Sequence, residues 1–472
     1  MAEVAMNWDA ITVCVAGVGV SGAACARVLA GLGAHVIAVD ARDGDAERAV
    51  AGELAAVGVD VRLGAGEALP EGTRLVVTSP GWRPTSPLLV AAVAAGVEVW
   101  GEPELAWRLR RPDAAEWLVV TGTDGKTTTT LMLEAMLRAG GYRAVAAGNI
   151  GRPLVEVANG PYDVLAVELG SFQLHWSPSV APAAAAVLNV APDHVDWHGT
   201  LAAYVDAKGR AFAHTGLAVG NADDAGSTRL LARAAGRRVS FTLGSPRPHQ
   251  LGVVEELLVD RAFVDDPDNG AVELATLSDI RVPGPHNVAN ALAAAALARA
   301  FGVAPVGVGE GLRTFRPAAH RIAEVAVIDG VRYVDDSKAT SPHAAAASLT
   351  SFDSIVWIAG GLGKGTGFDD VVRVASPRLR AAVVFGACRA ELREALTRHA
   401  ADVPVVEVIG SDTEDVDSVM DRIVTAAADL ARRGDVVLLA PAAASMDMFR
   451  DYGHRGEAFA AAVSRLHQRA VR

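Results

Sequence analysis

Short apolar runs alternate along the whole chain with longer stretches in which apolar positions recur at helical spacing. Runs of this kind, rich in β-branched residues and bounded by glycine or polar residues, predict buried strands. Their regular alternation with helices is typical of parallel α/β sheets. The strands predicted in this way are residues 11–16, 36–39, 75–78, 118–121, 164–168, 185–189, 355–359, 382–385 and 436–440.

A glycine turn follows the predicted strand at 118–121, in the residues Gly122-Thr-Asp-Gly125-Lys126-Thr127, which we name the phosphate loop. A strand, a glycine turn and a helix in succession point backbone N–H groups and a helix N-terminus at a phosphate group. The lysine suits the β- and γ-phosphates, and the next hydroxyl suits Mg²⁺. The turn is two residues shorter than the usual motif, because Val120 stands where the first glycine is expected. We therefore predict a nucleoside-triphosphate site.

A second turn, Gly17-Val-Gly19-Val-Ser-Gly22, follows the first predicted strand, and Asp40 ends the next one. We name residues 17–22 the first glycine turn. Its G-x-G-x-x-G pattern is that of dinucleotide sites, in which the acidic residue contacts a ribose hydroxyl. The pattern itself requires only a helix N-terminus that holds a diphosphate and a carboxylate at a strand end. A UDP-linked ligand meets both requirements as well as NAD does, and we favour it because no hydride-transfer site follows.

Two charged breaks that contain a proline divide the chain, one at 108–113 and one around Arg316-Pro317. A chain of 472 residues is too long for a single core. We therefore predict an α/β protein of three domains. They are a Rossmann-like N-terminal domain at 1–111, a central P-loop ATPase-like α/β domain at 112–316, and a C-terminal Rossmann-like α/β domain at 317–472.

Composition narrows the class of protein. The net charge is −12, so neither nucleic acid nor an anionic membrane is expected as a partner. The three cysteines have no metal-binding spacing, and we expect Cys14 and Cys25 to be buried apolar residues. So sparse a cysteine content fits a reducing compartment, and no signal peptide or membrane span is read. We expect a cytoplasmic monomer.

Several polar residues follow predicted strands of the central domain. Glu168 ends a strand, where a carboxylate beside a phosphate loop suits an ATP-bound Mg²⁺. His194 follows the next strand, a place that favours a ligand or phosphate contact. Lys208 lies on a predicted helix, where spacing alone indicates a solvated charge. Asn287 and Asn290 share a helix face and suit an adenine or a ribose, although helix capping is nearly as compatible.

Together these motifs resemble the Mur ligase family, the ATP-dependent amide-bond enzymes of peptidoglycan precursor synthesis. The resemblance covers essentially the whole chain, and within the family it is to the enzymes that add D-glutamate to UDP-N-acetylmuramoyl-L-alanine through an acyl phosphate. It rests, in chain order, on G-T-D-G-K-T-T, E-L-G-S-F-Q-L, N-V-A-P-D-H, a helical lysine, H-N-V-A-N, H-R, D-D-S-K-A-T and P-A-A-A-S-M-D-M-F.

The resemblance implies a role for each candidate residue. The implied catalytic residues are Lys126, Glu168, His194 and Lys208. The implied Mg²⁺ ligands are Thr127, Glu168, His194 and Lys208, the last carbamylated so that it presents oxygens. The implied ATP contacts are Gly122, Thr123, Asp124, Gly125, Lys126, Thr127, Thr128, Asn290, Arg321 and Asp336. The implied substrate contacts are Val20, Ser21, Asp40, Arg42 and Asn149 for the UDP-linked substrate, and Lys338, Thr340, Lys364, Ser445 and Tyr452 for D-glutamate.

Three positions depart from the family pattern. Asp124 stands where an asparagine is usual and adds a negative charge near ATP, Ala41 replaces a threonine, and Tyr452 replaces a phenylalanine. Two alternatives stay open at this point. One is another amide ligase, of a different Mur type or of folylpolyglutamate type, although the separate first domain argues against the folate enzyme. The other is an NAD(P)-binding protein, which only the first glycine turn supports.

Overall fold

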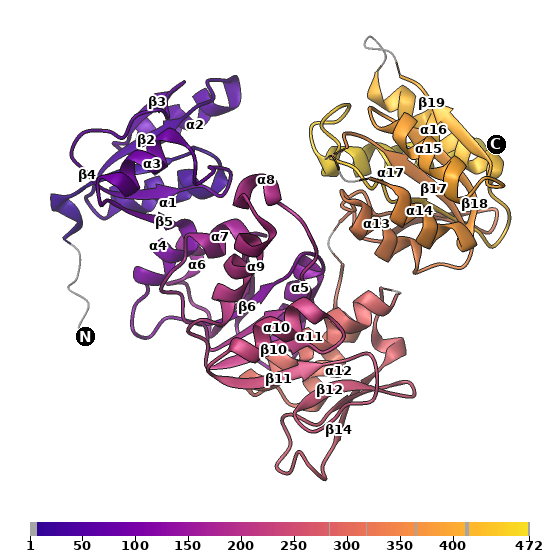
Figure 1. Cartoon of the computed structure of the whole chain (residues 1–472), viewed down its shortest axis with the longest axis horizontal. Coiled ribbons are helices and arrows are strands. Elements are labelled where there is room, and N and C mark those ends of the chain that lie inside the picture. Colours follow the sequence, from indigo (N-terminus) through magenta and orange to yellow (C-terminus); the bar gives the residue numbers. More distant parts are fainter. Residues whose placement is uncertain are drawn as a thin grey trace. The chain divides into compact units, whose positions relative to one another are not determined.

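The computed structural model describes residues 7–470 with the exception of 283, 318, 364, 366 and 411–414. The described residues form two compact units (Figure 1), one made of Met1–Arg281 with Val288–Phe315 and the other of Val282–Asn287 with Arg316–Arg472. The first unit holds two sheets in succession along the chain, and the second unit holds a further sheet.

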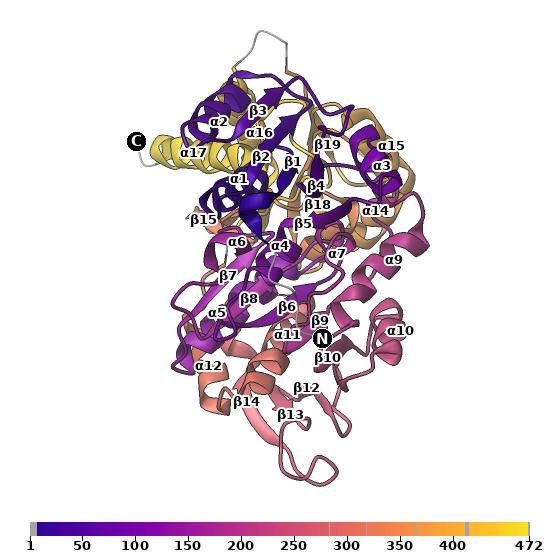
Figure 2. The same ribbon diagram turned by 90° about the vertical axis from the view of Figure 1, so that its left-hand side faces the viewer.

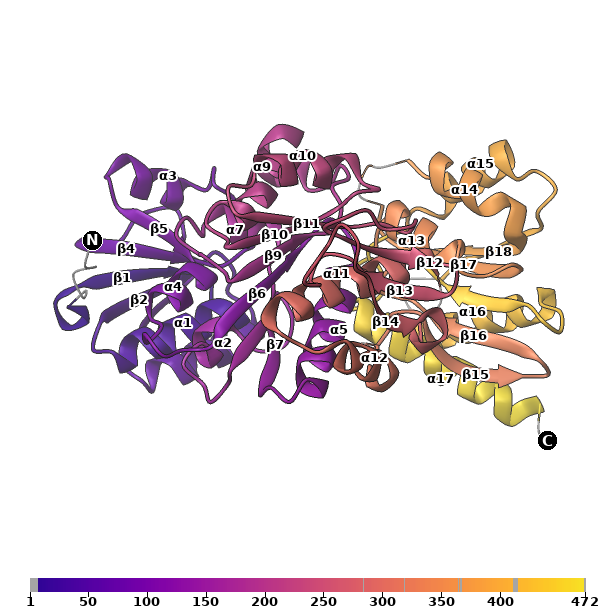
Figure 3. The ribbon, with the colours of Figure 1, turned by 90° about the horizontal axis from the view of Figure 1, so that it is seen from below.

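The sheet nearest the N-terminus has the strand order β3-β2-β1-β4-β5, and each neighbouring pair is parallel (Figure 3). Val13 and Val15 pack into the core on one face, and Cys14 packs on the other, because successive residues of a strand point to opposite faces. A sheet covered on both faces therefore needs a continuous apolar strand. The elements are β1 (Thr12–Ala16), α1 (Val20–Gly31), β2 (His35–Asp40), α2 (Asp45–Ala55), β3 (Asp60–Leu63), β4 (Thr73–Thr78), α3 (Pro87–Ala94), β5 (Glu98–Gly101) and α4 (Glu102–Arg108).

The second sheet has the order β14-β13-β12-β11-β10-β9-β6-β8-β7. Its strands run parallel from β7 to β12, and β13 and β14 are antiparallel additions at one edge. Helix α5 packs beside β6, β7 and β8 (Figure 2). The strands are β6 (Glu116–Thr121), β7 (Ala144–Gly148), β8 (Val164–Glu168), β9 (Ala184–Val187), β10 (Leu217–Asn221), β11 (Arg237–Phe241), β12 (Gln250–Val254), β13 (Leu257–Asp260) and β14 (Val272–Thr276). The helices are α5 (Lys126–Ala139), α6 (Leu154–Val157), α7 (Ser171–His175), α8 (Val195–His198), α9 (Leu201–Gly209), α10 (Ala225–Arg233), α11 (Pro285–Phe301) and α12 (Pro305–Thr314).

The third sheet has the order β15-β16-β20-β17-β18-β19, with β15 antiparallel and the others parallel. Trp357 and Leu438 lie in the core on one face, and Ile358 and Leu439 lie in the core on the other. The elements are β15 (Ala323–Ile328), β16 (Val331–Asp335), α13 (Pro342–Leu349), β17 (Ile355–Gly360), α14 (Asp369–Ala375), β18 (Leu379–Phe385), α15 (Arg389–His399), β19 (Val405–Val408), α16 (Val416–Leu430), β20 (Val436–Leu439) and α17 (Tyr452–Ala470).

The α/β class and the three-domain architecture predicted from the sequence are confirmed, and each predicted strand corresponds to a strand of the structure. The domain boundaries stay a prediction. The sequence pattern missed strands such as β3, in which exposed polar residues alternate with half-buried apolar ones over only four residues. The three cysteines are free and buried. Among the helices of the described residues, none is long and apolar enough to cross a membrane.

Candidate functional site

The phosphate loop joins β6 to α5 in the predicted manner. Gly125 precedes the helix with a φ of 83°, a conformation that favours glycine. A Cβ atom at Gly125 would lie 2.4 Å from Asn290 Oδ1, so the predicted ATP contact Asn290 lies directly against the loop. The Lys126 ammonium donates hydrogen bonds to the carbonyl oxygens of Gly122 (2.9 Å) and Thr123 (2.7 Å). The loop thus places a cation and a helix N-terminus at the same end of the sheet.

Asn189, directly after β9, fixes the conformation of the phosphate loop. Its Oδ1 accepts from the Asp124 amide at 2.9 Å, and its Nδ2 donates to the Asp124 carbonyl at 3.1 Å. Its own carbonyl accepts from the Thr123 amide at 3.1 Å. Sequence reasoning assigned Asn189 no role, and its position at a strand end before the Pro-Asp-His segment was the available signal. A neutral amide holds the loop here, so the anchor adds no charge next to a phosphate.

Three predicted residues meet around the carboxylate of Glu168. Its Oε2 accepts from Thr127 Oγ1 at 2.7 Å, and its Oε1 accepts from Asn149 Nδ2 at 2.8 Å. The carboxylate is only 1% exposed. A hydroxyl and a carboxylate at this separation are hard oxygen donors of the type that Mg²⁺ prefers, so the residues present fit that ion. No cluster of three or more histidine, cysteine or acidic side chains suited to a metal occurs among the described residues, so a metal here needs other ligands as well.

Lys208 is buried, with 1% of its surface exposed, so the solvated charge that spacing alone indicated is wrong. Its Nζ donates to the Gly122 carbonyl at 2.6 Å and lies 4.7 Å from the centre of the Tyr204 ring. Burial, and then the nearby Lys126 ammonium, lower the pKa of Lys208 well below its usual value. The two lysines share one carbonyl acceptor, and both burial and the neighbouring ammonium disfavour the charged form of Lys208.

His194 lies near Tyr204. It is the residue before α8 and takes a left-handed φ of 51°. Its amide and its Nε2 both contact the carboxylate of Asp193, at 2.9 and 3.2 Å. Its ring centre is 4.7 Å from that of Phe172 and 6.4 Å from that of Tyr204. The Tyr204 hydroxyl bonds Thr123 Oγ1 at 2.8 Å, so Tyr204 links His194 and Lys208 to the phosphate loop.

Further histidines surround this cluster. The Nε2 of His198 lies 3.0 Å from Ser171 Oγ, and the ring of His198 contacts that of His175. Burial, and then the charges of other cationic groups including His175, lower the pKa of His198 to about 4. Burial, and then the Arg210 guanidinium, lower the pKa of His175 to about 4. Both rings are therefore neutral at physiological pH.

In the first domain Asp40 anchors the first glycine turn. Its Oδ2 accepts from the Val18 amide at 3.0 Å, and its oxygens accept from the Arg42 amide and guanidinium at 3.0 to 3.2 Å. Burial alone would raise the pKa of Asp40, but the hydrogen bonds from Arg42 and Val18 together lower it below its usual value. Val20, at the start of α1, is 76% exposed, and Ser21 follows it half-buried. The turn therefore presents an open helix N-terminus beside a cation.

The remaining predicted residues lie in the second compact unit, so the predicted ATP contacts are divided between the units. The Asp336 carboxylate is buried and bonds Ser348 Oγ and the Ile322 amide, and burial raises its pKa to about 7. Lys338 Nζ lies 3.7 Å from the centre of the Tyr452 ring. Arg321 and Thr340 are half-buried and Ser445 is buried. Lys364 and its predicted contact lie outside the described residues.

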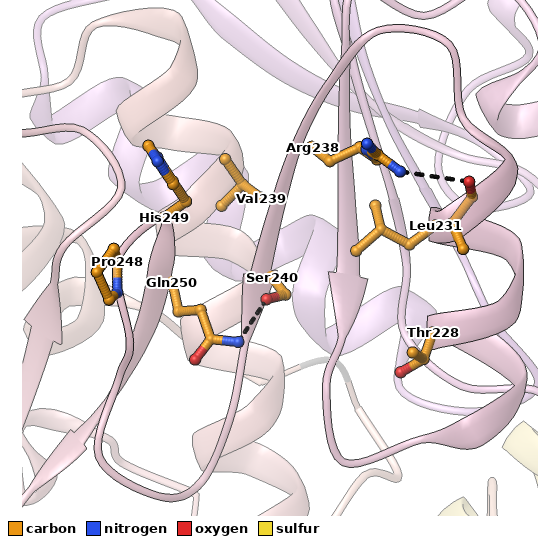
Figure 4. A pocket seen from close by; sticks show the side chains of 9 residues that line it. Thr228, Leu231, Arg238, Val239, Ser240, Pro248, His249 and Gln250 are labelled. Carbon is orange, nitrogen blue, oxygen red and sulfur yellow. Dashed lines mark hydrogen bonds between the residues drawn. The ribbon is translucent and has the colours of Figure 1, made fainter. Parts of the chain in front are cut away.

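A cavity of about 290 Å³ lies between α10, β11 and β12 (Figure 4). It contains none of the predicted site residues. Its polar side chains already bond within the protein, since Gln250 Nε2 donates to Ser240 Oγ at 2.9 Å and Arg238 donates to the Ala232 carbonyl at 3.3 Å. The candidate site is therefore the phosphate loop with its surroundings.

Comparison with known proteins gives consistent matches over the whole chain. Three family models match: the Mur ligase MurD-like N-terminal domain at 11–101, the Mur ligase middle domain at 120–298, and the Mur ligase glutamate ligase domain at 320–443. A UDP-N-acetylmuramoylalanine–D-glutamate ligase of Streptomyces avermitilis is 57% identical and covers 98% of this chain and 99% of its own. The enzyme of that name from Mycolicibacterium smegmatis is 48% identical, with 96% of each chain covered. The crystal structure of the UDP-N-acetylmuramate–alanine ligase of Thermotoga maritima shares the fold, with a TM-score of 0.57, 20% identity, and coverage of 97% of this chain and 100% of its own.

Proposed function

The chain belongs to the Mur ligase family, and from this premise we propose that it is the ATP-dependent ligase that adds D-glutamate to UDP-N-acetylmuramoyl-L-alanine in peptidoglycan precursor synthesis. The observation that carries the proposal is 57% identity to enzymes of that name over nearly the full length of both chains. The NAD(P)-binding alternative explains neither the glutamate ligase domain at 320–443 nor the phosphate loop.

The reaction proceeds through an acyl phosphate. The terminal carboxylate of the L-alanyl substrate attacks the γ-phosphorus of ATP, and ADP leaves. The amine of D-glutamate then attacks the acyl carbon, loses a proton, and displaces phosphate to leave the amide. Phosphoryl transfer of this kind depends mainly on positioning and on neutralising charge.

Lys126 is proposed to neutralise charge on the transferred phosphoryl group. Its ammonium rests on the Gly122 and Thr123 carbonyls at the mouth of the phosphate loop, within reach of a phosphate held by the loop amides. The Asn189 amide supports the loop without adding an anion that would compete with the nucleotide. Asn290, against Gly125, is proposed to contact the nucleotide from the other side of the loop.

Mg²⁺ would be held by Thr127 and Glu168, and at a second position by His194 and a carbamylated Lys208. When bound, the ion supplies positive charge to the phosphate oxygens. The neutral form of a lysine amine is the form that attacks CO₂: a nitrogen–carbon bond forms, one proton is lost to solvent, and a carbamate anion results. This change replaces a group that would repel a cation with oxygens that bind one. The burial and the lowered pKa of Lys208 support this proposal.

We assign the other predicted contacts as follows. The first glycine turn, with Asp40 and Arg42, is proposed to hold the UDP group, and Asn149 to contact the muramoyl portion. Arg321 and Asp336 are proposed to reach ATP, and the residues proposed for D-glutamate are Lys338, Thr340, Lys364, Ser445 and Tyr452. We also propose the domain boundaries 1–111, 112–316 and 317–472, and a cytoplasmic location, which the free cysteines support.

A phosphate-release assay tests the function directly. Purified protein is given ATP, Mg²⁺ and UDP-N-acetylmuramoyl-L-alanine with a panel of D- and L-amino acids. We expect release with D-glutamate and only background with the others. Release with a different amino acid would reassign the ligase. Absence of release, together with binding of NADH seen by tryptophan fluorescence, would favour the NAD(P)-binding alternative.

A further inference from the structure

The guanidinium of Arg455, in the first turn of α17, is completely buried. Its Nε donates to Ser337 Oγ at 3.0 Å, and its Nη2 donates to the Ser337 carbonyl at 2.9 Å. The remaining hydrogen bonds go to the carbonyls of Gly360, Ala443 and Ala444, at 3.2 to 3.3 Å. A planar fork of five N–H donors is the side chain best suited to hold several backbone acceptors at once.

The segments held by Arg455 follow three neighbouring parallel strands. Ser337 comes after β16, Gly360 ends β17, and Ala443 and Ala444 come after β20, and the sheet order places β20 between the other two. The carboxyl ends of neighbouring parallel strands are where open α/β sheets bind ligands. The segments are also tied to one another, because Leu362 and Ala444 exchange backbone hydrogen bonds at 2.8 and 3.0 Å.

Two of the residues that Arg455 contacts lie beside residues proposed for the acceptor amino acid. Ser337 precedes Lys338, and Ala444 precedes Ser445. Tyr452 lies one turn before Arg455 on the same helix, and its carbonyl accepts from Ser337 Oγ at 2.8 Å. The backbone on which these side chains are mounted is therefore fixed by a single guanidinium.

The charge of Arg455 has no direct counterion. Among the described residues no carboxylate lies within salt-bridge distance of it, and its partners are neutral carbonyl and hydroxyl oxygens. A buried charge without a paired opposite charge is costly, and burial lowers the pKa of Arg455 to about 10, so it stays protonated at neutral pH. The carboxylates of Asp447 and Asp335, beyond salt-bridge distance, act in the opposite direction and raise that pKa.

We propose that Arg455 is a positioning residue for the acceptor site: it fixes the segments that carry Lys338, Ser445 and Tyr452. This inference rests on the proposed ligase function and goes beyond it, because it assigns the geometry of the acceptor site to a residue that touches no substrate. The positioning role explains why an arginine is buried beside the carboxyl ends of these strands, where burying an apolar side chain would cost less free energy.

The test compares Arg455→Lys with Arg299→Lys. Arg299, in the last turn of α11, is also largely buried, and it bonds Asp260 and two backbone carbonyls. We expect Arg455→Lys to raise the KM for D-glutamate about tenfold or more and to leave the KM values for ATP and the UDP-linked substrate within about threefold. Arg299→Lys should lower the melting temperature without that selective change.

Ser337→Ala removes only one of the acceptors and keeps the inference testable if Arg455→Lys fails to fold. It should raise the KM for D-glutamate by about two- to fivefold, with ATP unaffected. An equal rise in all three KM values, or an unchanged KM for D-glutamate in both variants, would overturn the positioning role. If the wild type used another acceptor, the ligase assignment would fail, while a selective rise in the KM of that acceptor would still support the role of Arg455.

Discussion

The first glycine turn and the phosphate loop have the same local construction. Each follows a buried parallel strand, contains one glycine with positive φ and opens a helix. Each loop is also held by a residue from the end of another strand, Asp40 in one case and Asn189 in the other. Backbone geometry alone would assign them the same kind of ligand.

Their charges differ. The first glycine turn is held by a carboxylate, which keeps the Arg42 guanidinium beside it. The phosphate loop is held by a neutral amide and the Tyr204 hydroxyl, and two lysines converge on its Gly122 carbonyl. A triphosphate carries more negative charge than a diphosphate ester, and an anionic anchor beside it would oppose binding. The comparison teaches that the anchor and its neighbours, rather than the glycine pattern, select the ligand.

We expect the largest effect from removing Lys208, a lysine that bonds the phosphate loop and has no counterpart among the described contacts of the first glycine turn. If Lys208 is the proposed carbamylated metal ligand, Lys208→Ala should lower turnover by about 10³-fold, because the metal that would neutralise the transferring phosphate loses that ligand. The Kd of the UDP-linked substrate, followed by tryptophan fluorescence, should stay within about threefold. In wild-type enzyme depleted of carbonate, added bicarbonate should raise activity. Full activity in the variant would mean that Lys208 serves only the fold.

Replacing the neutral amide that holds the phosphate loop with a carboxylate should have the next largest effect. Asn189→Asp puts into the phosphate loop the carboxylate that the first glycine turn has. It loses the hydrogen bond to the Asp124 carbonyl and adds an anion, so we expect the KM for ATP to rise about 10- to 100-fold. Asn221→Asp, in which the altered amide bonds the Leu188 carbonyl, is the matched control. If both variants raise the KM for ATP equally, the anchor has no special role.

Replacing the carboxylate that holds the first glycine turn with a neutral amide should have a smaller effect. Asp40→Asn keeps an acceptor for the Val18 amide but removes the anion that holds Arg42, so the KM for the UDP-linked substrate should rise about three- to tenfold. The KM for ATP, from the same initial-rate measurements, should not change. Arg27 and Glu53 form an exposed ion pair in the same domain, so Glu53→Gln is a suitable control. A rise in the KM for ATP would show that the two loops are not independent.

The smallest expected effect concerns stability at acid pH, because the half-buried histidines His175 and His198 lie on the phosphate loop side. The pKa of His175 is lowered in the folded protein to about 4, so below pH 6.5 the unfolded chain binds more protons. Its contribution to the free energy of unfolding is therefore present above pH 6.5 and is lost as the pH falls toward 4. Because the ring is partly exposed, we expect a loss of only about 1 kcal/mol after solvent screening.

Urea denaturation at pH 7 and pH 5 measures this loss. His175→Gln should show a shallower decline in stability between the two pH values than the wild type. The exposed His249 of the same domain provides the control substitution His249→Gln, which should follow the wild type. If the stability of His175→Gln declines as steeply as that of the wild type, His175 does not contribute to the loss of stability at acid pH.

Local patterns of the sequence determined a large part of this protein. The continuous apolar runs of β1, β6, β8 and β17 predict strands that are covered on both faces, and each run can be read within a single strand. The glycine at 125 and the lysine after it specify a turn and a helix start within a few residues. The order of the motifs also indicated the family, because each motif is a short local sequence.

Only the tertiary structure decided the charges of the site. Lys208 reads as a surface lysine in its own helix, and it becomes a buried amine because its Nζ meets a carbonyl 86 residues away. Arg455 likewise meets Ser337 across 118 residues, and Asn189 meets Asp124 across 65. Burial and hydrogen-bond partners are set by neighbours distant in sequence, and these determine pKa and affinity. The sequence by itself therefore determined where the loops lie, and the packing of distant segments decided what those loops can bind.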